Sequence, residues 1–252
     1  MKIEDSVALV TGGNRGIGEA FVRALLAAGA ARVHVGARDP VNAAHLVAEA
    51  PDRVTAVRLD VAQPDQIAEA ARACGDVSIL VNNAGAFLNR RLIGADDISA
   101  AREEMEVNYF GMLGMCRAFA PILAKNGGGA IVNVLSSGGL AAVPGMGGYS
   151  PSKFAARAAT TCIRAELAGQ GTQVSALIVG SVDTRMAAHV AGFKEAPADI
   201  AKAGLNAIRR GIDEMDTDRM AIEVRASLHR DPKGLEKSMA RMLDAEQIST
   251  RR

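Results

Sequence analysis

The chain has no tryptophan and few aromatic residues of any kind. Aromatic side chains make up 3% of its 252 residues, while hydrophobic residues as a whole make up 49%. This composition excludes a core packed around large rings and favours aliphatic side chains with close backbone contacts, which the 26 glycines permit. The length is near the upper end for one hydrophobic core, and the composition is that of a soluble globular protein.

The sequence also lacks an excess of charge of either sign. Lysine and arginine total 29 against 28 aspartates and glutamates, which gives a formal net charge of +1. Nucleic acids and anionic membranes attract strongly basic surfaces. We therefore expect neither as a partner.

Cysteine and histidine are scarce and show no metal-ligand spacing. There are three cysteines, far apart along the chain: Cys74, Cys116 and Cys162. There are four histidines, equally scattered: His34, His45, His189 and His229. This pattern excludes a disulfide framework and argues against a metal site. We expect the cysteines to be small buried hydrophobic residues in a reducing compartment.

We also find neither the pattern of a secretory signal nor that of a membrane-spanning helix in the sequence. Residues Met1–Asp5 carry charges where a signal needs an apolar run. No apolar stretch approaches the roughly 20 residues of a membrane-spanning helix. We therefore expect a cytoplasmic protein.

Short apolar runs alternate with longer segments of helical periodicity. The predicted strands are Val7–Thr11, Val33–Ala37, Thr55–Asp60, Ile79–Asn83, Ala130–Leu135 and Val174–Val179. The segments between them include the predicted helices Gly16–Ala28 and Ile98–Lys125. This alternation predicts an α/β fold, a doubly wound parallel sheet of six to seven strands flanked by helices on both faces. No linker or repeat divides residues 1–252, so we expect a single domain.

The C-terminal part is less regular. Helices are predicted over Asp199–Gly211 and Met220–Arg230, with a short edge strand at Ile212–Asp216 between them. The pair Asp231-Pro232 is a stop signal for the second helix. The polar tail, residues 233–252, is expected to fray.

A glycine-rich loop lies between the first predicted strand and helix, within Thr11–Gly18. Here Gly12 permits a tight turn, Gly16 lets the backbone approach a pyrophosphate, and Gly18 allows close packing of helix on strand. The loop also contains Asn14, Arg15 and Ile17. Glycine-rich turns are common, but in this position the helix N-terminus offers N–H groups to phosphates. The pattern predicts a dinucleotide site.

The end of the second strand indicates which dinucleotide binds. An acidic residue about twenty residues after the glycine loop holds the ribose hydroxyls of NAD, whereas a basic residue accepts the 2′-phosphate of NADP. Ala37 occupies the acidic position and Arg38 follows it, with Arg15 as a second base. We therefore predict that NADP(H) is preferred over NAD(H), although Asp39 argues the other way.

Tyr149 and Lys153 are four residues apart and so share one helix face. A free tyrosine titrates near pH 10, and a nearby ammonium group favours the phenolate and lowers that pKa. This spacing is common by chance. Its significance comes from Ser136, which ends a predicted strand shortly before.

In these motifs, taken with Asp60-Val61, Asn82–Gly85 and Asn108, the sequence resembles the short-chain dehydrogenase/reductase family over about residues 7–184. The resemblance implies a Rossmann fold with an integrated catalytic site. It implies that Tyr149 is the general acid and base, that Lys153 binds the nicotinamide ribose and lowers the tyrosine pKa, and that Ser136 binds the substrate oxygen.

The resemblance also implies roles for further residues. Asn108 would position a water molecule linked to Lys153. The remaining cofactor contacts would come from Asp60, Val61, Asn82, Ala84, Gly85, Val182 and Thr184. Ser137 would be a structural hydroxyl, and Ser150 and Ser152 would help to start the helix.

Two departures from the family pattern affect these expectations. Val179 stands where many members carry proline, so the backbone beside the nicotinamide is expected to be less fixed. The charged run Asp213–Asp216 replaces a Val-Asp-Gly-Gly motif and puts the common tetramer contact in doubt. We expect a homodimer or homotetramer, with a dimer built on helices Ile98–Lys125 and Tyr149–Leu167.

The function expected from these residues is NADPH-dependent transfer of hydride between the cofactor and a ketone, aldehyde or secondary alcohol. The alternative is a catalytically silent nucleotide-binding regulator on the same fold. A dehalogenase-like lyase is less consistent with the intact glycine loop. The sequence does not identify the small-molecule substrate.

Overall fold

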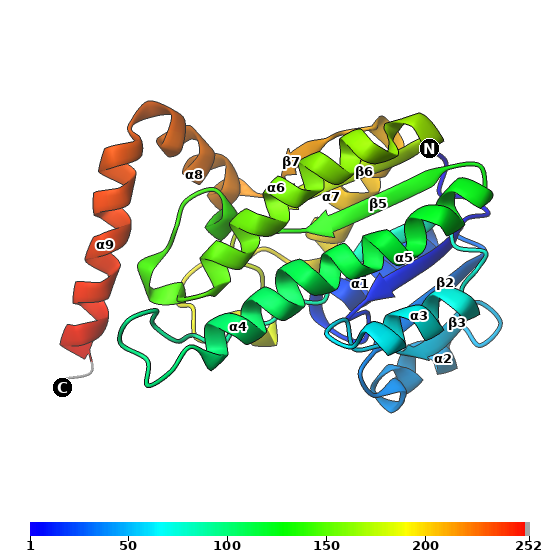
Figure 1. The fold of residues 1–252 in the computed structure, drawn as a ribbon, viewed down its shortest axis with the longest axis horizontal. Helices are drawn as coiled ribbons and strands as arrows, with labels where there is room; N and C mark the ends of the chain where they lie inside the picture. Colours follow the sequence, from blue (N-terminus) through cyan, green and yellow to red (C-terminus); the bar gives the residue numbers. More distant parts are fainter. Residues whose placement is uncertain (250–252) are drawn as a thin grey trace.

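The computed structural model describes the fold of residues 1–249 and the side chains of residues 1–241 and 243. Its centre is a parallel sheet in the order β3-β2-β1-β4-β5-β6-β7 (Figure 1). The strands are β1 (Val7–Thr11), β2 (Arg32–Ala37), β3 (Val54–Arg58), β4 (Ile79–Asn82), β5 (Gly129–Val134), β6 (Thr172–Ile178) and β7 (Glu214–Asp216). The predicted doubly wound α/β fold is confirmed, and the last predicted strand does lie at an edge.

Strand boundaries differ from the sequence prediction by one or two residues. The third strand was predicted to reach Asp60, but β3 ends at Arg58. The reason is a turn at Asp60, whose N–H donates to Gln66 and whose carboxylate accepts from the N–H of Ala62. A residue engaged in such a turn cannot continue the sheet ladder.

Helices cover both faces of the sheet (Figure 1). One hydrophobic core includes residues of α1 (Gly16–Ala27), α2 (Ala44–Glu49) and α7 (Pro197–Arg210). The other includes residues of α3 (Pro64–Ala73), α5 (Met112–Lys125) and α6 (Tyr149–Leu167). Side chains alternate between the two cores along each strand, so Ala8 and Val10 face the first and Leu9 the second.

The predicted helix Ile98–Lys125 is one long helical segment with a change of winding inside it. It consists of α4 (Ser99–Met105), a π-helix (Glu106–Gly111) and α5. By length and mean hydropathy, 1.2, this segment could cross a membrane, so the expectation that no such stretch exists is wrong. In this fold, however, Met115, Phe119 and Leu123 are buried against the sheet.

A helix occupies the tail up to Ser249, and residues 250–252 lie outside the described residues, so the expected fraying stays a prediction. After α8 (Arg219–Arg230), Asp231-Pro232 both ends that helix and begins α9 (Pro232–Ser249). The Asp231 carboxylate accepts from the N–H of Gly234, which caps the new helix, and proline fits the first helical turn. Figure 1 shows α9 beside the body of the domain, where it contacts the short 3-10 helix Pro144–Met146.

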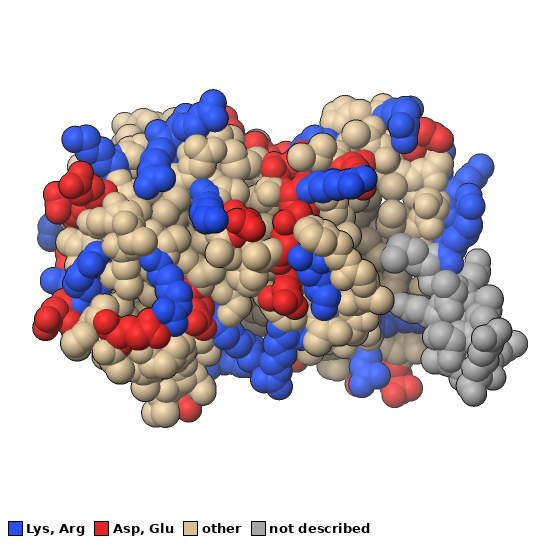
Figure 2. All heavy atoms as spheres, turned by 180° about the vertical axis from the view of Figure 1, so that it is seen from behind, with Lys and Arg blue, Asp and Glu red and all other residues tan. Residues whose placement is uncertain are grey.

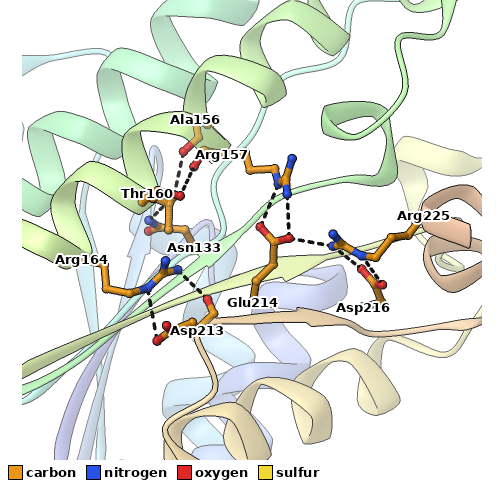
Figure 3. Close-up of polar contacts among 10 residues, drawn as sticks. Asn133, Ala156, Arg157, Thr160, Arg164, Asp213, Glu214, Asp216 and Arg225 are labelled. Carbon is orange, nitrogen blue, oxygen red and sulfur yellow. Dashed lines mark hydrogen bonds and ion pairs between the residues drawn. The ribbon is translucent and has the colours of Figure 1, made fainter. Parts of the chain in front are cut away.

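The charged run at β7 is neutralised within the chain (Figure 3). Glu214 accepts hydrogen bonds from Arg157 on α6 and Arg225 on α8, and Arg225 also pairs with Asp216 at 2.6 Å. Partial burial alone would raise the pKa of Glu214, but the two guanidinium groups outweigh it and lower that pKa. This network ties β7 to α6 and α8.

The rest of the surface shows mixed charges and one exposed thiol. Acidic and basic groups are interspersed over the face seen in Figure 2. Among the cysteines, Cys74 and Cys116 are buried as expected, whereas Cys162 is exposed on α6, which corrects the prediction of three buried thiols.

The contact between α1 and α7 predicts a sharp difference between two glycine substitutions. A Cβ at Gly204 would overlap the Phe21 ring, with Cε1 2.5 Å away, whereas a Cβ at Gly169 meets nothing within 4 Å. Overpacking costs typically about 1–3 kcal/mol. We expect Gly204→Ala to reduce the free energy of unfolding by about this amount, measured by urea denaturation. The matched control Gly169→Ala should change it by less than about 0.5 kcal/mol. Equal effects of the two substitutions would contradict the packing argument.

Candidate active site

The candidate site residues meet at the carboxyl edge of the parallel sheet. The glycine loop follows β1, the Asn82–Gly85 segment ends β4, Ser136 follows β5, and Val182 and Thr184 follow β6. In open α/β sheets this edge, next to the point where strand order reverses, is where ligands bind.

The glycine loop has the geometry of a phosphate cradle. Gly12 and Gly16 have φ angles of +60° and +56°, values that side-chain-bearing residues rarely adopt. A Cβ at Gly18 would lie 2.6 Å from Nδ2 of Asn83 and would also clash with the Gly12 carbonyl. Helix α1 begins after Arg15 with no side-chain cap, so N–H groups of its first turn are not capped by a side chain. These features fit the pyrophosphate of a dinucleotide.

Thr11 and Asn83 hold this loop in place. The Asn83 side-chain amide donates to the carbonyls of Thr11 at 3.0 Å and Gly12 at 3.1 Å. In return, the Thr11 hydroxyl accepts from the N–H groups of Asn83 and Ala84. Asn83 thus satisfies backbone groups at the ends of β1 and β4, a role that an asparagine directly after a buried strand suits.

Asn82 lies in the core, away from the cleft surface. It is 6% exposed, and its amide donates to Asn133 at 2.9 Å and to the Cys116 sulfur at 3.3 Å. Asn133 in turn donates to Thr160 on α6, as Figure 3 shows. The geometry supports a bracing role for Asn82 between β4, β5 and α6.

The two candidate 2′-phosphate ligands are exposed near the loop. Arg15 and Arg38 are both solvent-exposed, and the N–H of Gly13 donates to the Gly36 carbonyl, which places the loop beside the end of β2. The competing acid, Asp39, accepts from the N–H of Val41 and caps a short 3-10 helix. Its carboxylate is therefore engaged in its own turn.

The other residues expected at the adenosine end have structural contacts of their own. Asn14 and Ile17 are half-buried in the loop and the first turn of α1. The Asp60 carboxylate is engaged by the N–H of Ala62, and Val61 is 7% exposed. A Cβ at Gly111 would lie 2.8 Å from a methyl group of Val61, so Val61 packs closely on the π-helix.

The buried residues Ser136 and Lys153 form one polar cluster with the half-buried Tyr149. Burial raises the pKa of Tyr149, while its hydrogen bond with Ser136 lowers it and the Glu104 charge raises it; the net direction is upward. The Lys153 ammonium lies 5.6 Å from the Tyr149 ring centroid and donates to the Val134 carbonyl at 3.1 Å. Burial lowers the pKa of Lys153 to about 8. The lowered tyrosine pKa that the resemblance implies is thus not a property of the protein alone.

Asn108 lies in the π-helix, a type of winding often found at functional sites. Its Oδ1 accepts from the N–H of Ala86, and its amide donates to the Ala86 carbonyl and to the Ser152 hydroxyl, each at 2.9 Å. A Cβ at Gly85 would lie 3.1 Å from Asn108 Oδ1 and 3.8 Å from Lys153 Nζ. Glycine at this position leaves the space between the two groups open, which is compatible with the expected water.

The backbone beside the nicotinamide position is held by Asp218. One carboxylate oxygen accepts from the N–H of Gly180 at 2.7 Å, and the other caps α8 at the N–H of Ala221. This bond restrains the backbone next to Val179, and the expectation that it is less fixed than with proline stays a prediction. Sequence reasoning missed Asp218 because it follows the irregular β7 segment. Beyond Gly180, Val182 is 4% exposed, and Thr184 lies 3.2 Å from where a Cβ at Gly16 would be.

Together these residues fit a nicotinamide dinucleotide. The glycine cradle and the uncapped helix suit the pyrophosphate, the exposed arginines suit a 2′-phosphate, and Lys153 suits a ribose hydroxyl. When bound, such a cofactor supplies or accepts the hydride. The chain itself provides a phenol, a hydroxyl and an ammonium group beside it.

Comparisons with known proteins agree with this geometry. The sequence profile of the short chain dehydrogenase family matches residues 6–194. Over 184 residues the chain is 37% identical to a 3-alpha-(or 20-beta)-hydroxysteroid dehydrogenase of Mycobacterium tuberculosis, covering 71% of this chain and 70% of that protein.

Solved structures are similar over nearly the whole chain. A short-chain dehydrogenase from Burkholderia cenocepacia, in complex with NADP, is 40% identical with a TM-score of 0.90, covering 95% of this chain and 99% of that one. A 3-ketoacyl-(acyl-carrier-protein) reductase from Brucella melitensis, complexed with NADH, is 26% identical with a TM-score of 0.79, covering 86% and 99%.

Proposed function

Because the chain belongs to the short-chain dehydrogenase family and is an NAD(P)-dependent dehydrogenase acting on CH–OH and C=O groups, we propose that it is an NADPH-dependent carbonyl reductase, or an alcohol dehydrogenase in reverse. The observation that carries this proposal is the cluster of Tyr149, Ser136 and Lys153, with Ser136 at the same edge of the sheet as the glycine loop.

In this proposal each group of the cluster has one task. The Ser136 hydroxyl and the Tyr149 phenol hydrogen-bond the carbonyl oxygen of the substrate. Tyr149 donates its proton as negative charge develops on that oxygen. Lys153 holds the ribose. Burial raises the tyrosine pKa, and we expect the Lys153 ammonium, 5.6 Å from the ring centroid, to favour the phenolate and so to oppose that rise. The raised pKa keeps the phenol protonated, as reduction requires.

We further propose that the substrate is largely apolar. The Phe87 ring packs edge-on against the Tyr149 ring at 5.2 Å, and the His189 ring stacks on Phe87 at 5.3 Å. The loop after β6 adds Met186 and Phe193, both exposed. These side chains suit a cyclic or aromatic ketone, and the similarity to a protein named as a hydroxysteroid dehydrogenase supports that choice.

Arg15 and Arg38 lead us to expect that NADPH binds at least about tenfold more tightly than NADH, since a charge-assisted contact contributes roughly 1.5–3 kcal/mol. Arg38→Asp should reduce or reverse the preference. Dissociation constants of both cofactors, titrated against the wild type and the variant, provide the measurement. Arg72→Asp, at an exposed arginine in the last turn of α3, is the charge control. Equal affinities of the wild type for the two cofactors would refute this preference.

The catalytic assignment predicts three different phenotypes. Tyr149→Phe should lower kcat by about 10²–10⁴-fold with NADPH affinity nearly unchanged, because the ring still packs but the transferable proton is gone. Ser136→Ala should lower kcat/KM by a smaller factor, since it removes one hydrogen bond to the developing alkoxide. Lys153→Met should damage both rate and cofactor binding.

These kinetics are measured as NADPH oxidation with a panel of cyclic and aromatic ketones. A Tyr149→Phe enzyme that reduces its best ketone at the wild-type rate would show that the active site is placed wrongly. A wild-type protein that binds NADPH tightly and reduces no carbonyl in the panel would favour the regulator alternative.

We also propose a homodimer built on α5 and α6. A groove of about 500 Å³ lies between these helices, lined partly by Ala155, Ala158 and Ala159, and small side chains allow close packing across a two-fold axis. Ala158→Arg should convert the dimer to a monomer in light scattering at micromolar concentration. Ala31→Arg, at an exposed alanine outside this groove, should leave the mass unchanged. A wild-type monomer would contradict the proposal.

A further inference from the structure

Glu104 on α4 is a buried acid for which the family resemblance provides no role. Its residue exposure is 0%. One carboxylate oxygen, Oε1, accepts from the N–H of Leu88 at 2.7 Å, which ties α4 to the segment that follows β4. Full burial of a carboxyl group is costly, so its presence calls for a compensating role.

The second oxygen, Oε2, lies against the residue that precedes Tyr149. A Cβ at Gly148 would be only 2.8 Å from Oε2, so glycine is required for the two to approach this closely. Oε2 is buried and has no hydrogen bond of ordinary geometry among the described residues. Burial raises the pKa of Glu104, and the nearby N–H groups of Leu88 and Gly148 oppose that rise only in part.

Asn108, four residues after Glu104, makes a parallel set of contacts. It holds Ala86 through both backbone groups and donates to the Ser152 hydroxyl, which itself donates to the Tyr149 carbonyl. Glu104 thus contacts Leu88 and Gly148, while Asn108 contacts Ala86 and Ser152.

The two aromatic rings lie between these paired contacts. Phe87 is flanked by Ala86 and Leu88, and Tyr149 stands between Gly148 and Ser152. The rings touch edge-on at 5.2 Å. Glu104 and Asn108, on one helical segment, therefore hold the backbone on both sides of Phe87 and of Tyr149.

We propose that Glu104 is a positioning residue for Tyr149, holding the phenol and the Phe87 ring in the arrangement needed for proton transfer to the substrate. This inference rests on the proposed carbonyl reduction. Loss of the contact would let the segment around Leu88 and the start of α6 move apart, and misplacement of a catalytic group by about 1 Å can cost about 10²-fold in rate.

The charge of Glu104 also acts on the phenol. Besides burial, which is the larger cause, the carboxylate raises the pKa of Tyr149 and so favours the protonated form that reduction uses. The titratable groups that interact with it are Glu103 on the same helix and Tyr149 on α6. An ordinary carboxyl group titrates several pH units below an ordinary phenol, so we expect Glu104 to be ionised where Tyr149 loses its proton.

Two substitutions separate the hydrogen bond from the charge. Glu104→Gln keeps an oxygen that can accept from Leu88 and removes the charge, whereas Glu104→Leu removes both. We expect Glu104→Leu to lower kcat for ketone reduction about tenfold or more with the NADPH dissociation constant within about twofold. Glu104→Gln should recover a large part of that loss. Glu103→Gln, at the exposed neighbour, is the matched control and should keep wild-type kinetics.

The phenol can be observed directly because the chain has two tyrosines and no tryptophan. In a Tyr109→Phe background, near-ultraviolet absorbance follows ionisation of Tyr149 alone. We expect Glu104→Gln to move this titration to lower pH, because the carboxylate no longer opposes the phenolate. A residue that only stabilised the fold would leave the titration in place.

The outcomes distinguish this inference from the proposed function. Wild-type kcat in Glu104→Leu, or a folded Glu104→Gln with an unchanged Tyr149 titration, would overturn the positioning role while leaving carbonyl reduction intact. If Glu104→Leu does not fold, the Glu104→Gln titration decides. A wild-type protein with no reductase activity would refute the proposed function, and the titration would still test the contact between Glu104 and the phenol.

Discussion

The hydrogen bonds between Thr11 and Asn83 join the ends of the two central strands, β1 and β4, and the rest of the site is arranged around that junction. Parallel strands leave unpaired backbone groups at their carboxyl edge, and these groups need partners. Here the Asn83 amide satisfies the carbonyls of Thr11 and Gly12, and the Thr11 hydroxyl satisfies two N–H groups. The phosphate cradle is thereby fixed by contacts that do not require a ligand.

Around the Tyr149 phenol, buried polar side chains likewise provide hydrogen-bond partners for backbone groups. Asn108 and Glu104 replace water as partners of backbone groups in the Ala86–Leu88 segment. Such contacts are weak when counted singly, but leaving a buried donor without a partner costs more than making the bond gains. The segments beside Tyr149 are therefore restricted to few arrangements, which is a requirement for accurate proton transfer.

The sequence predicted features that depend on local pattern. Strand β1 and helix α1 follow from apolar periodicity and the glycine loop, and the fold class follows from their alternation. Positions that depend on tertiary partners were not predictable in this way. Nothing near Asp218 in the sequence indicates that it reaches Gly180, 38 residues earlier, and nothing near Asn82 distinguishes its core position from the cleft position of Asn83.

The tail illustrates a different limit. Its polar composition predicts fraying, and the pair Asp231-Pro232 indicates the end of α8 without indicating that Asp231 also caps α9. Likewise, the mean hydropathy of α4 and α5 reflects a helix packed on a sheet, which composition alone does not distinguish from a membrane-spanning helix. In both cases the same residues allow two structures, and the contacts made across the fold select one.

The Asp218 carboxylate couples α8 to the backbone at Gly180, at the edge of the candidate site. Its two oxygens connect the Gly180 backbone to the first turn of α8, so opening of that turn and release of the Gly180 N–H are coupled events. A ligand that orders the segment after β6 through this bond therefore also disfavours local opening of α8, by thermodynamic reciprocity. Amide hydrogen exchange in α8 therefore reports on occupancy of a pocket that α8 itself need not touch.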